Sequence, residues 1–209
     1  MDGRTSMGDL IPQAAELWQL AGVTKPIILA SSSPRRAAIL RAVGCPFKVV
    51  PPSVQESEYG SWDGGELLRR RAVQKAESVK AEFSAYSVLA ADTIVKLDDR
   101  VFGKPQDHQE AASILRSLSG RVHEVWTAMC FIPATSGIGN TVVSRTAVTL
   151  RPLSSSEINA YVMTGEPLDK AGAYGIQGIG GLWIQSIEGC YFNVVGLPLS
   201  QLWDLIKSV

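Results

Sequence analysis

The sequence contains few residues of the kinds that build disulfide frameworks or histidine metal centres. Its 209 residues include three cysteines, Cys45, Cys130 and Cys190, an odd and scattered set that suits free thiols in a reducing compartment. The only two histidines are His108 and His123. The sequence therefore argues against a disulfide-stapled fold and against a metal site built from histidine.

The sequence also has no excess of charge and no long apolar run. Twenty basic residues balance twenty acidic ones, so no overall field draws the chain to nucleic acid or membrane. No apolar run approaches the roughly 20 residues of a membrane span, and residues 1–10 lack the order of a secretory signal. We therefore expect a cytoplasmic protein with no nucleic-acid or membrane partner, in which any bound polyanion is small and held locally.

The apolar content, 45% of residues, is sufficient for one large core. We expect residues 1–24 to form an N-terminal extension with a short helix, and residues 25–209 to form one domain. Strand patterns alternate with helix patterns, and several strand pairs are separated only by turn-like loops, which favours an α/β fold with a mixed sheet and flanking helices over a purely parallel sheet. The expected hairpins are 87–97 with a short strand after it, 122–132 with 141–150, and 182–195 around Glu188 and Gly189.

Helix starts are indicated by residues that accept hydrogen bonds from the first backbone N–H groups. A capping box pairs such a residue with an acidic residue three positions later. The sequence offers three of these pairs, Asp63–Glu66, Asp107–Glu110 and Ser154–Glu157, and a further helix with Ser33 as N-cap, Pro34 at its first position and Gly44 beyond its end.

The stretch "LASSSPRRAAIL" places two arginines, Arg35 and Arg36, at the positive end of a helix. A bound anion would explain them, because helix N-termini bind phosphate or carboxylate and guanidinium groups clamp phosphate oxygens. Ser31 and Ser33 would add hydroxyl donors. The alternative is an ordinary capped helix with solvated arginines, which this stretch alone favours.

"AADTIV" places Asp92 inside an apolar strand, beside Thr93. Because an unpaired buried carboxylate is expensive, Asp92 needs a function or a dedicated partner. Its chemistry suits holding a divalent cation or taking a proton from an attacking water.

Lysines and a glycine-rich stretch complete the candidates. Lys75 follows Arg71 by four residues, a spacing that by itself indicates a solvated helix face. Lys104 and Lys170 lie in loops, where ligands are commonly held. In "GAYGIQGIGG", the Gln177 amide carries both donor and acceptor groups, suited either to reading a nucleobase edge or to an exposed turn.

Taken together, "LASSSPRRAAIL", "AADTIV…GKP", "AASILRSLSGRVHEVWTA" and "YVMTGEPLDKAGAYGIQGIGG" resemble the Maf family of nucleoside-triphosphate pyrophosphatases over residues 26–206. The resemblance implies a fold like that of inosine-triphosphate pyrophosphatases, with two lobes around a cleft, often as a homodimer. It also implies hydrolysis of a nucleoside triphosphate to the monophosphate and pyrophosphate with a divalent cation, Mg²⁺ or Mn²⁺.

Carried onto this sequence, the resemblance makes Asp92 the proton acceptor and a metal ligand, with Glu56 aiding the metal or the water. Phosphates would be held by Ser31, Arg35, Arg36, Lys75 and Lys104, and Lys75 would join the catalytic set. Arg35, Thr93 and Gln177 match the branch of the family that acts on dTTP and UTP. Hence Asp92→Ala is expected to abolish pyrophosphate release and leave the fold intact.

Two alternatives remain open on the sequence. One is a nucleotide-binding regulator, for example of cell division, that hydrolyses little. The other is a pyrophosphatase that acts on modified nucleotides.

Overall fold

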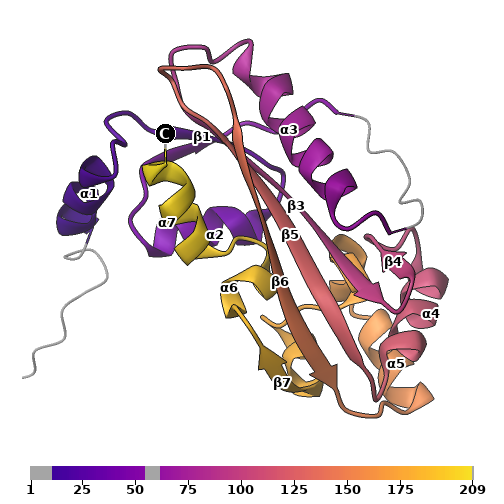
Figure 1. Ribbon diagram of the computed structural model, residues 1–209. Helices are drawn as coiled ribbons and strands as arrows, with labels where there is room; N and C mark the ends of the chain where they lie inside the picture. The colour runs from indigo at the N-terminus through magenta and orange to yellow at the C-terminus, as the bar shows by residue number, and fades with distance from the viewer. Residues whose placement is uncertain (1–10, 55–61, 209) are drawn as a thin grey trace, which may run out of the picture.

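The computed structural model describes residues 11–54 and 62–208. Its α-helices are α1 Ile11–Leu20, α2 Pro34–Ala42, α3 Glu66–Lys80, α4 His108–Leu118, α5 Ser155–Val162, α6 Tyr191–Val195 and α7 Leu199–Lys207. Its strands are β1 Ile27–Ala30, β2 Phe47–Val49, β3 Val88–Leu97, β4 Arg100–Phe102, β5 Val122–Ile132, β6 Asn140–Leu150 and β7 Ile184–Glu188. Three 3₁₀ turns follow α5, namely η1 Glu166–Asp169, η2 Ala171–Ala173 and η3 Ile179–Trp183. Figure 1 shows their arrangement.

The strands form one mixed seven-stranded sheet in the order β2-β1-β3-β5-β6-β7, with β4 paired to β3. β1 runs parallel to β2 and to β3, and every other pairing is antiparallel. The predicted hairpins β3–β4 and β5–β6 are present. The predicted mixed α/β sheet with flanking helices is therefore confirmed.

One edge of β3 is covered in two separate pieces. β1 pairs with residues 88–90 of β3, and β4 pairs with residues 95–97. Between them, residues 91–94 carry no strand on that edge within the described part of the chain. Asp92 and Thr93 lie in this interruption, so the chain breaks the sheet where its polar strand residues are.

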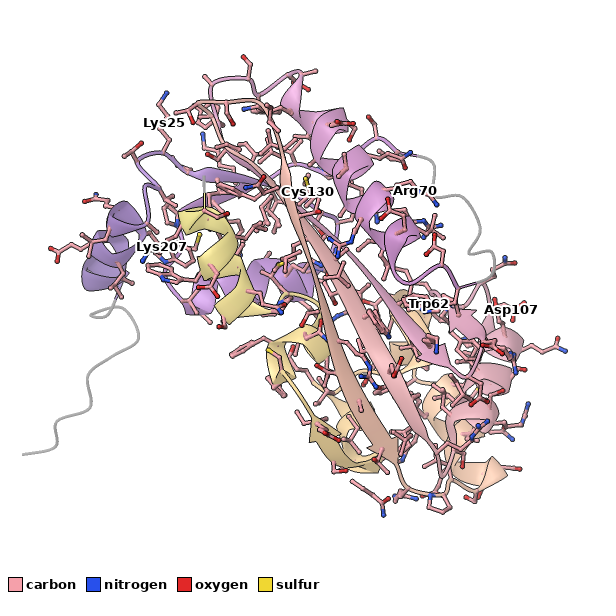
Figure 2. The ribbon with its side chains drawn as sticks, in the orientation of Figure 1. Lys25, Trp62, Arg70, Asp107, Cys130 and Lys207 are labelled. Atoms are coloured by element: carbon pink, nitrogen blue, oxygen red, sulfur yellow. The ribbon has the colours of Figure 1, made fainter. Side chains whose placement is uncertain are left out.

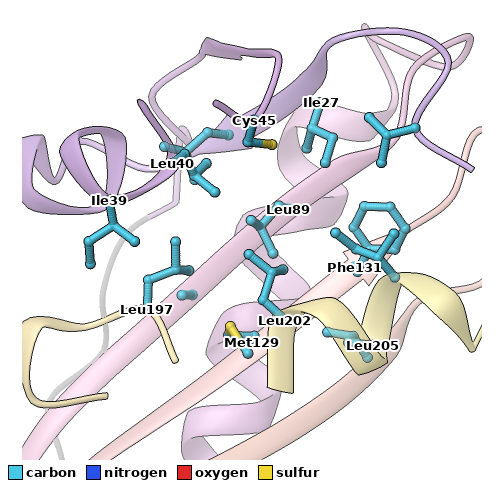
Figure 3. Close-up of a cluster of buried hydrophobic side chains, with 14 of the residues drawn as sticks. Ile27, Ile39, Leu40, Cys45, Leu89, Met129, Phe131, Leu197, Leu202 and Leu205 are labelled. Atoms are coloured by element: carbon cyan, nitrogen blue, oxygen red, sulfur yellow. The ribbon is translucent and has the colours of Figure 1, made fainter. Parts of the chain in front are cut away.

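The two faces of the sheet carry separate hydrophobic cores. On one face, β3 residues of even number such as Ala90 pack against α3 through Leu68 and Ala72. On the other face, Leu89 packs with residues of α2 and α7, including Leu202, as Figure 3 shows. Farther along that second face a third cluster joins β3 to α4 and α5. Side chains of β3 therefore alternate between α3 on one side and the remaining helices on the other.

The predicted strand pairing within 182–195 is wrong after residue 188. β7 does form, but it pairs with β6, and residues 191–195 are helix α6. Contacts distant in sequence decide this. The Thr146 hydroxyl of β6 donates to the Cys190 carbonyl and accepts from the Cys190 N–H, and the buried Asn193 side chain donates to Thr146 and to the Val125 carbonyl. β6 thus fixes the start of α6.

The local helix signals succeed to different degrees. Ser154 and Glu157 form the complete predicted capping box, and Asp107 accepts from the Glu110 N–H at the start of α4 (Figure 2). Asp63 accepts from the Leu67 N–H, but the N-cap position of α3 is Gly65. Ser33 occupies the N-cap position of α2 and makes no capping hydrogen bond with its side chain.

The helix expected within residues 1–24 is present as α1, and it packs on the domain. The Trp18 side chain is 5% exposed, lies edge-on to Trp203 of α7 at 5.6 Å between centroids, and donates from Nε1 to the Val43 carbonyl at 3.0 Å. Leu17, its neighbour, is 56% exposed. Trp18 therefore joins this helix to α2 and α7.

We predict that Trp18→Ala lowers the free energy of unfolding by about 3–5 kcal/mol, because it empties a large buried site. Leu17→Ala is the matched control and should change it by less than about 0.5 kcal/mol, since exposed positions contribute little. Urea unfolding of both variants measures the difference. Equally small changes would mean that α1 does not pack on the domain in solution.

Candidate functional site

A cavity of about 720 Å³ lies at the interruption in the edge of β3. That volume falls in the range of small-molecule and cofactor sites. Nearly all of the site residues predicted from the sequence line it, namely Ser31, Ser33, Arg35, Arg36, Lys75, Asp92, Thr93, Lys104 and Gln177. Glu56, the remaining one, lies outside the described residues. The structure therefore brings together side chains from five separate segments of the sequence.

Asp92 points from β3 towards α3 and is 4% exposed. Lys75 Nζ donates to Asp92 Oδ1 at 2.6 Å, and Arg71 Nη1 lies 3.6 Å from Oδ2. Both cations are buried, so the interpretation of Arg71 and Lys75 as a solvated face is wrong. Arg70, the residue before Arg71, points outward with its side chain 60% exposed (Figure 2). α3 thus presents two cations to the one carboxylate that the apolar strand carries.

Arg71 is one of the charged cavity residues that were not predicted from the sequence; Glu110 and Asp169 are the others. The signal was available for Arg71, because its spacing from Lys75 puts both on one helix face together with the apolar residues Leu68, Ala72 and Ala76. A cation on the apolar face of a helix faces the core, where it needs an anion. The spacing could not predict that β3, with Asp92, packs against that face of α3.

Arg36 is buried and serves the protein's own backbone. Its guanidinium donates to four protein oxygens, which are Gly196 O, Ser31 Oγ, Ala91 O and Thr93 Oγ1. The Ala91 carbonyl belongs to the uncovered stretch of β3, so Arg36 supplies a donor where β1 has ended. Arg36 therefore fixes the cavity wall and holds the hydroxyls of Ser31 and Thr93.

Arg35 reaches across the cavity. Its Nη1 donates to Asp169 Oδ2 at 2.7 Å and its Nη2 to the Asp169 carbonyl at 3.1 Å, joining α2 to η1. Partial burial by itself would raise the pKa of Asp169, but hydrogen bonds from Lys170 and Arg35 outweigh burial and lower that pKa. The two adjacent arginines thus differ, because Arg35 forms a partly exposed ion pair and the Arg36 guanidinium is buried.

The remaining predicted residues lie on the exposed side of the cavity. Lys104 and Gln177 are exposed, and both line it. Lys170, also in the lining, donates to the Glu166 carbonyl and to Asp169 Oδ1. Tyr174 lines the cavity from behind, where its Oη lies 2.6 Å from His123 Nε2. Burial lowers the pKa of His123 to about 4, so this imidazole is neutral at pH 7.

The charges around the cavity favour an anion. Six cationic side chains and three carboxylates line it within the described residues. The cations are Arg35, Arg36, Arg71, Lys75, Lys104 and Lys170, and the carboxylates are Asp92, Glu110 and Asp169. Focusing by such a cleft raises the local concentration of a small polyanion even though the whole chain is neutral.

No cluster of three or more histidine, cysteine, aspartate or glutamate side chains that could hold a metal occurs in ranges 11–54 and 62–208. A cage built from protein ligands is thus lacking there. Asp92 offers carboxylate oxygens to the cavity, and Mg²⁺ is commonly held by one or two carboxylates together with substrate phosphates and water. The donor set fits a metal that arrives with a phosphate ligand.

Across the same ranges, no helix is long and apolar enough to span a membrane.

The fold and the cavity define an α/β protein with a cleft that is lined by cationic side chains and contains a buried carboxylate. The family model for Maf-like proteins matches residues 26–209, and the chain belongs to this family.

The relatives have similar lengths. The chain is 47% identical over 180 residues to the dTTP/UTP pyrophosphatase of Moorella thermoacetica, covering 86% of this chain and 93% of that one. It is 45% identical over 182 residues to the dTTP/UTP pyrophosphatase of Carboxydothermus hydrogenoformans, covering 87% and 97%. A solved structure, that of the Staphylococcus aureus Ham1 protein, is similar with a TM-score of 0.48 and 12% identity over 88% of this chain and 99% of that one.

Proposed function

We propose that this protein is a nucleoside-triphosphate pyrophosphatase that hydrolyses dTTP and UTP to the monophosphate and pyrophosphate. The observation that carries the proposal is the position of Asp92, whose carboxylate lies in the same cavity as the cationic side chains of α2 and α3. An anion-binding cleft with a buried carboxylate suits attack of water on a phosphate. The names of the relatives, dTTP/UTP pyrophosphatases, supply the substrate class.

The triphosphate is bound by charge. The phosphate chain lies between Arg35 of α2, Lys104 of the loop after β4, and the pair Arg71 and Lys75 of α3, all of which line the cavity. Fixed cations stabilise the charge that develops on the leaving pyrophosphate, because they do not have to reorganise during the reaction. Arg36 contributes by orienting Ser31 and Thr93 and keeping the wall rigid.

Asp92 accepts the proton of the attacking water. Lys75 Nζ, 2.6 Å from Oδ1, fixes the orientation of the carboxylate, which lines the cavity and can accept further hydrogen bonds. A general base must lie within hydrogen-bond reach of the water that it activates, and orientation by a neighbour provides this. Glu56 keeps its predicted role beside the water, outside the described residues.

A divalent cation, Mg²⁺ or Mn²⁺, would be held by Asp92 and Glu56 together with substrate phosphates. When bound, it supplies charge neutralisation on the transferring phosphoryl group. These residues would supply only part of its coordination, which suits a cofactor that enters as a complex with the nucleotide.

The nucleobase is recognised by the glycine-rich loop, residues 175–180, which carries Gln177. Gln177 is exposed at the cavity and carries both a donor and an acceptor, the complement of the carbonyl and N–H edge of a pyrimidine. A site that hydrogen-bonds a base rejects bases that leave its polar groups unpaired.

We also propose that the protein resides in the cytoplasm, is a homodimer, and has no nucleic-acid or membrane partner.

A panel of triphosphates tests the function directly. Pyrophosphate release is measured with dTTP, UTP, dCTP, dATP, GTP and methylated pyrimidine and purine triphosphates, each with Mg²⁺ and with Mn²⁺. Preferential release from dTTP and UTP is expected. Nucleotide binding without release would support the regulator that hydrolyses little, and preference for a methylated substrate would support action on modified nucleotides.

We predict that Gln177→Ala lowers the ratio of kcat/KM for dTTP to that for dATP by about tenfold or more, because the pyrimidine loses its hydrogen-bonding partner. Gln106→Ala is the matched control, since Gln106 is also an exposed glutamine that lines the cavity. The control should keep the ratio. A ratio unchanged in Gln177→Ala would place the base reader elsewhere.

A further inference from the structure

The carboxylate of Glu166 lies beneath the loop that carries Gln177. Glu166 is half-buried on η1 and is not part of the cavity lining. Its Oε2 accepts from the Ile179 N–H at 3.1 Å, and its Oε1 accepts from the Gly180 N–H at 3.3 Å. Oε1 also accepts from the Tyr161 hydroxyl at 2.9 Å. One carboxylate thus collects two backbone donors of the loop and a hydroxyl from α5.

The loop lies directly against this carboxylate. A Cβ atom added at Gly178 would come within 2.9 Å of Glu166 Oε1, and Gly178 has a φ of +111° that other residues rarely adopt. A Cβ atom at Gly180 would come within 2.8 Å of the Tyr161 hydroxyl. The glycines therefore permit close approach of backbone to Glu166, which makes the hydrogen bonds above possible.

Gln177 immediately precedes the anchored residues. Glycine-rich backbone has many accessible conformations, so the position of Gln177 depends on what fixes its neighbours. On the other side of it, the Lys170 stem lies against Gly175, where an added Cβ would be 2.7 Å from Lys170 Cε. Lys170 in turn donates to the Glu166 carbonyl at 2.6 Å. Residues 166–170 therefore support the loop on both sides of Gln177.

We propose that Glu166 is a positioning residue for base selectivity, acting through the backbone of residues 178–180 to hold Gln177 at the cavity. This inference rests on the proposed function, since it concerns how that site chooses its base. Glu166 touches neither the cavity nor Asp92, so its removal should change which base is accepted far more than the hydrolytic step.

The test is Glu166→Gln, assayed with dTTP and dATP. Glutamine keeps the size of the side chain but offers one acceptor oxygen and turns an NH₂ group towards backbone donors. Because small displacements of a positioned group cost up to about a hundredfold, we expect the dTTP/dATP ratio of kcat/KM to fall by about tenfold to a hundredfold. The fall should come from a raised KM for dTTP, with kcat for dTTP within about threefold of the unaltered protein.

The matched control is Glu157→Gln. Glu157 also lies away from the cavity and also accepts from a backbone N–H, that of Ser154, but it caps α5 and does not contact the loop. Its variant should keep the selectivity ratio. A loss of folded protein lowers turnover of both substrates equally, so the ratio separates positioning from a merely structural role.

Tyr161→Phe removes one of the three hydrogen bonds to Glu166 and keeps the ring against Trp183, and it should lower the ratio by a smaller factor. An unchanged ratio in Glu166→Gln overturns the inference while leaving the proposed function in place. If Glu166→Gln does not fold, an unchanged ratio in Tyr161→Phe overturns it. Absence of pyrophosphate release by the unaltered protein overturns the proposed function and the inference together.

Discussion

Replacing Asp92 with asparagine is expected to lower kcat for pyrophosphate release from dTTP by at least about a hundredfold, the usual effect of removing one well-placed electrostatic group. Asparagine keeps the shape and one acceptor for Lys75, but it cannot take a proton from water. KM should change less than kcat, because the cations that we propose to hold the phosphates remain. Steady-state pyrophosphate release over a range of dTTP concentrations measures both constants.

The same change carries a stability cost that the sequence did not indicate. Asp92 contacts Lys75 and Arg71 while 4% exposed, and removing one partner of a buried ion pair costs about 3–5 kcal/mol. The expectation that the fold is left intact therefore needs a measurement. Urea unfolding at the assay temperature shows whether Asp92→Asn is folded there, and activity is compared at a temperature at which it is folded.

Asp98→Asn is the control for both measurements. Asp98 follows β3 and pairs with Arg121 at 2.8 Å, with its side chain 68% exposed. An exposed pair of this kind contributes about 0–1 kcal/mol, so stability should change by no more than that and activity should stay the same. Turnover by Asp92→Asn close to that of Asp98→Asn would remove Asp92 from the proposed reaction.

The same substitution at the two adjacent arginines should lower the free energy of unfolding by different amounts. Arg36→Met leaves the buried acceptors at Ala91 and Gly196 without their donor, and each unsatisfied buried group costs about 1–3 kcal/mol. We therefore expect a loss of about 3 kcal/mol or more in the free energy of unfolding. Arg35→Met removes a partly exposed ion pair and should cost about 1 kcal/mol or less.

Substrate binding should separate the two arginines again. Arg35→Met is expected to raise KM for dTTP, because the side chain that spans the cavity to Asp169 no longer meets the phosphates. Each variant loses one positive charge, so the comparison holds net charge constant. Equal destabilisation by the two substitutions would contradict the division into a supporting and a binding arginine.

The different contacts of Arg35 and Arg36 explain why two cations lie at the positive end of α2. Pro34 starts α2 directly after the serines, and both arginines follow in its first turn. Arg36 turns inward to oxygens left where β1 ends, and Arg35 turns to Asp169 on η1. Neither arginine is an ordinary solvated side chain, and only Arg35 reaches across the cavity.

Helix and strand positions were predictable where the signal is local. The Ser154–Glu157 capping box is complete within a few residues. β3 was predictable because its apolar residues form a continuous run without a helical period. Such elements follow from hydrogen bonds and side-chain patterns that neighbours in sequence provide. The prediction failed at residues 191–195 because Thr146, more than forty positions earlier, directs the backbone there.

The sequence by itself determined the candidates for the site: a carboxylate in an apolar strand, two arginines at a helix start and a glutamine among glycines are each unusual in their local setting. Only the tertiary structure decided what each one does. In the folded chain, Arg71 and Lys75 contact Asp92, and Arg36 donates to backbone carbonyl groups. Glu166 accepts from the backbone of the loop that carries Gln177. The physical reason is that a buried charge is fixed by the partner that burial brings to it, and that partner comes from another part of the chain.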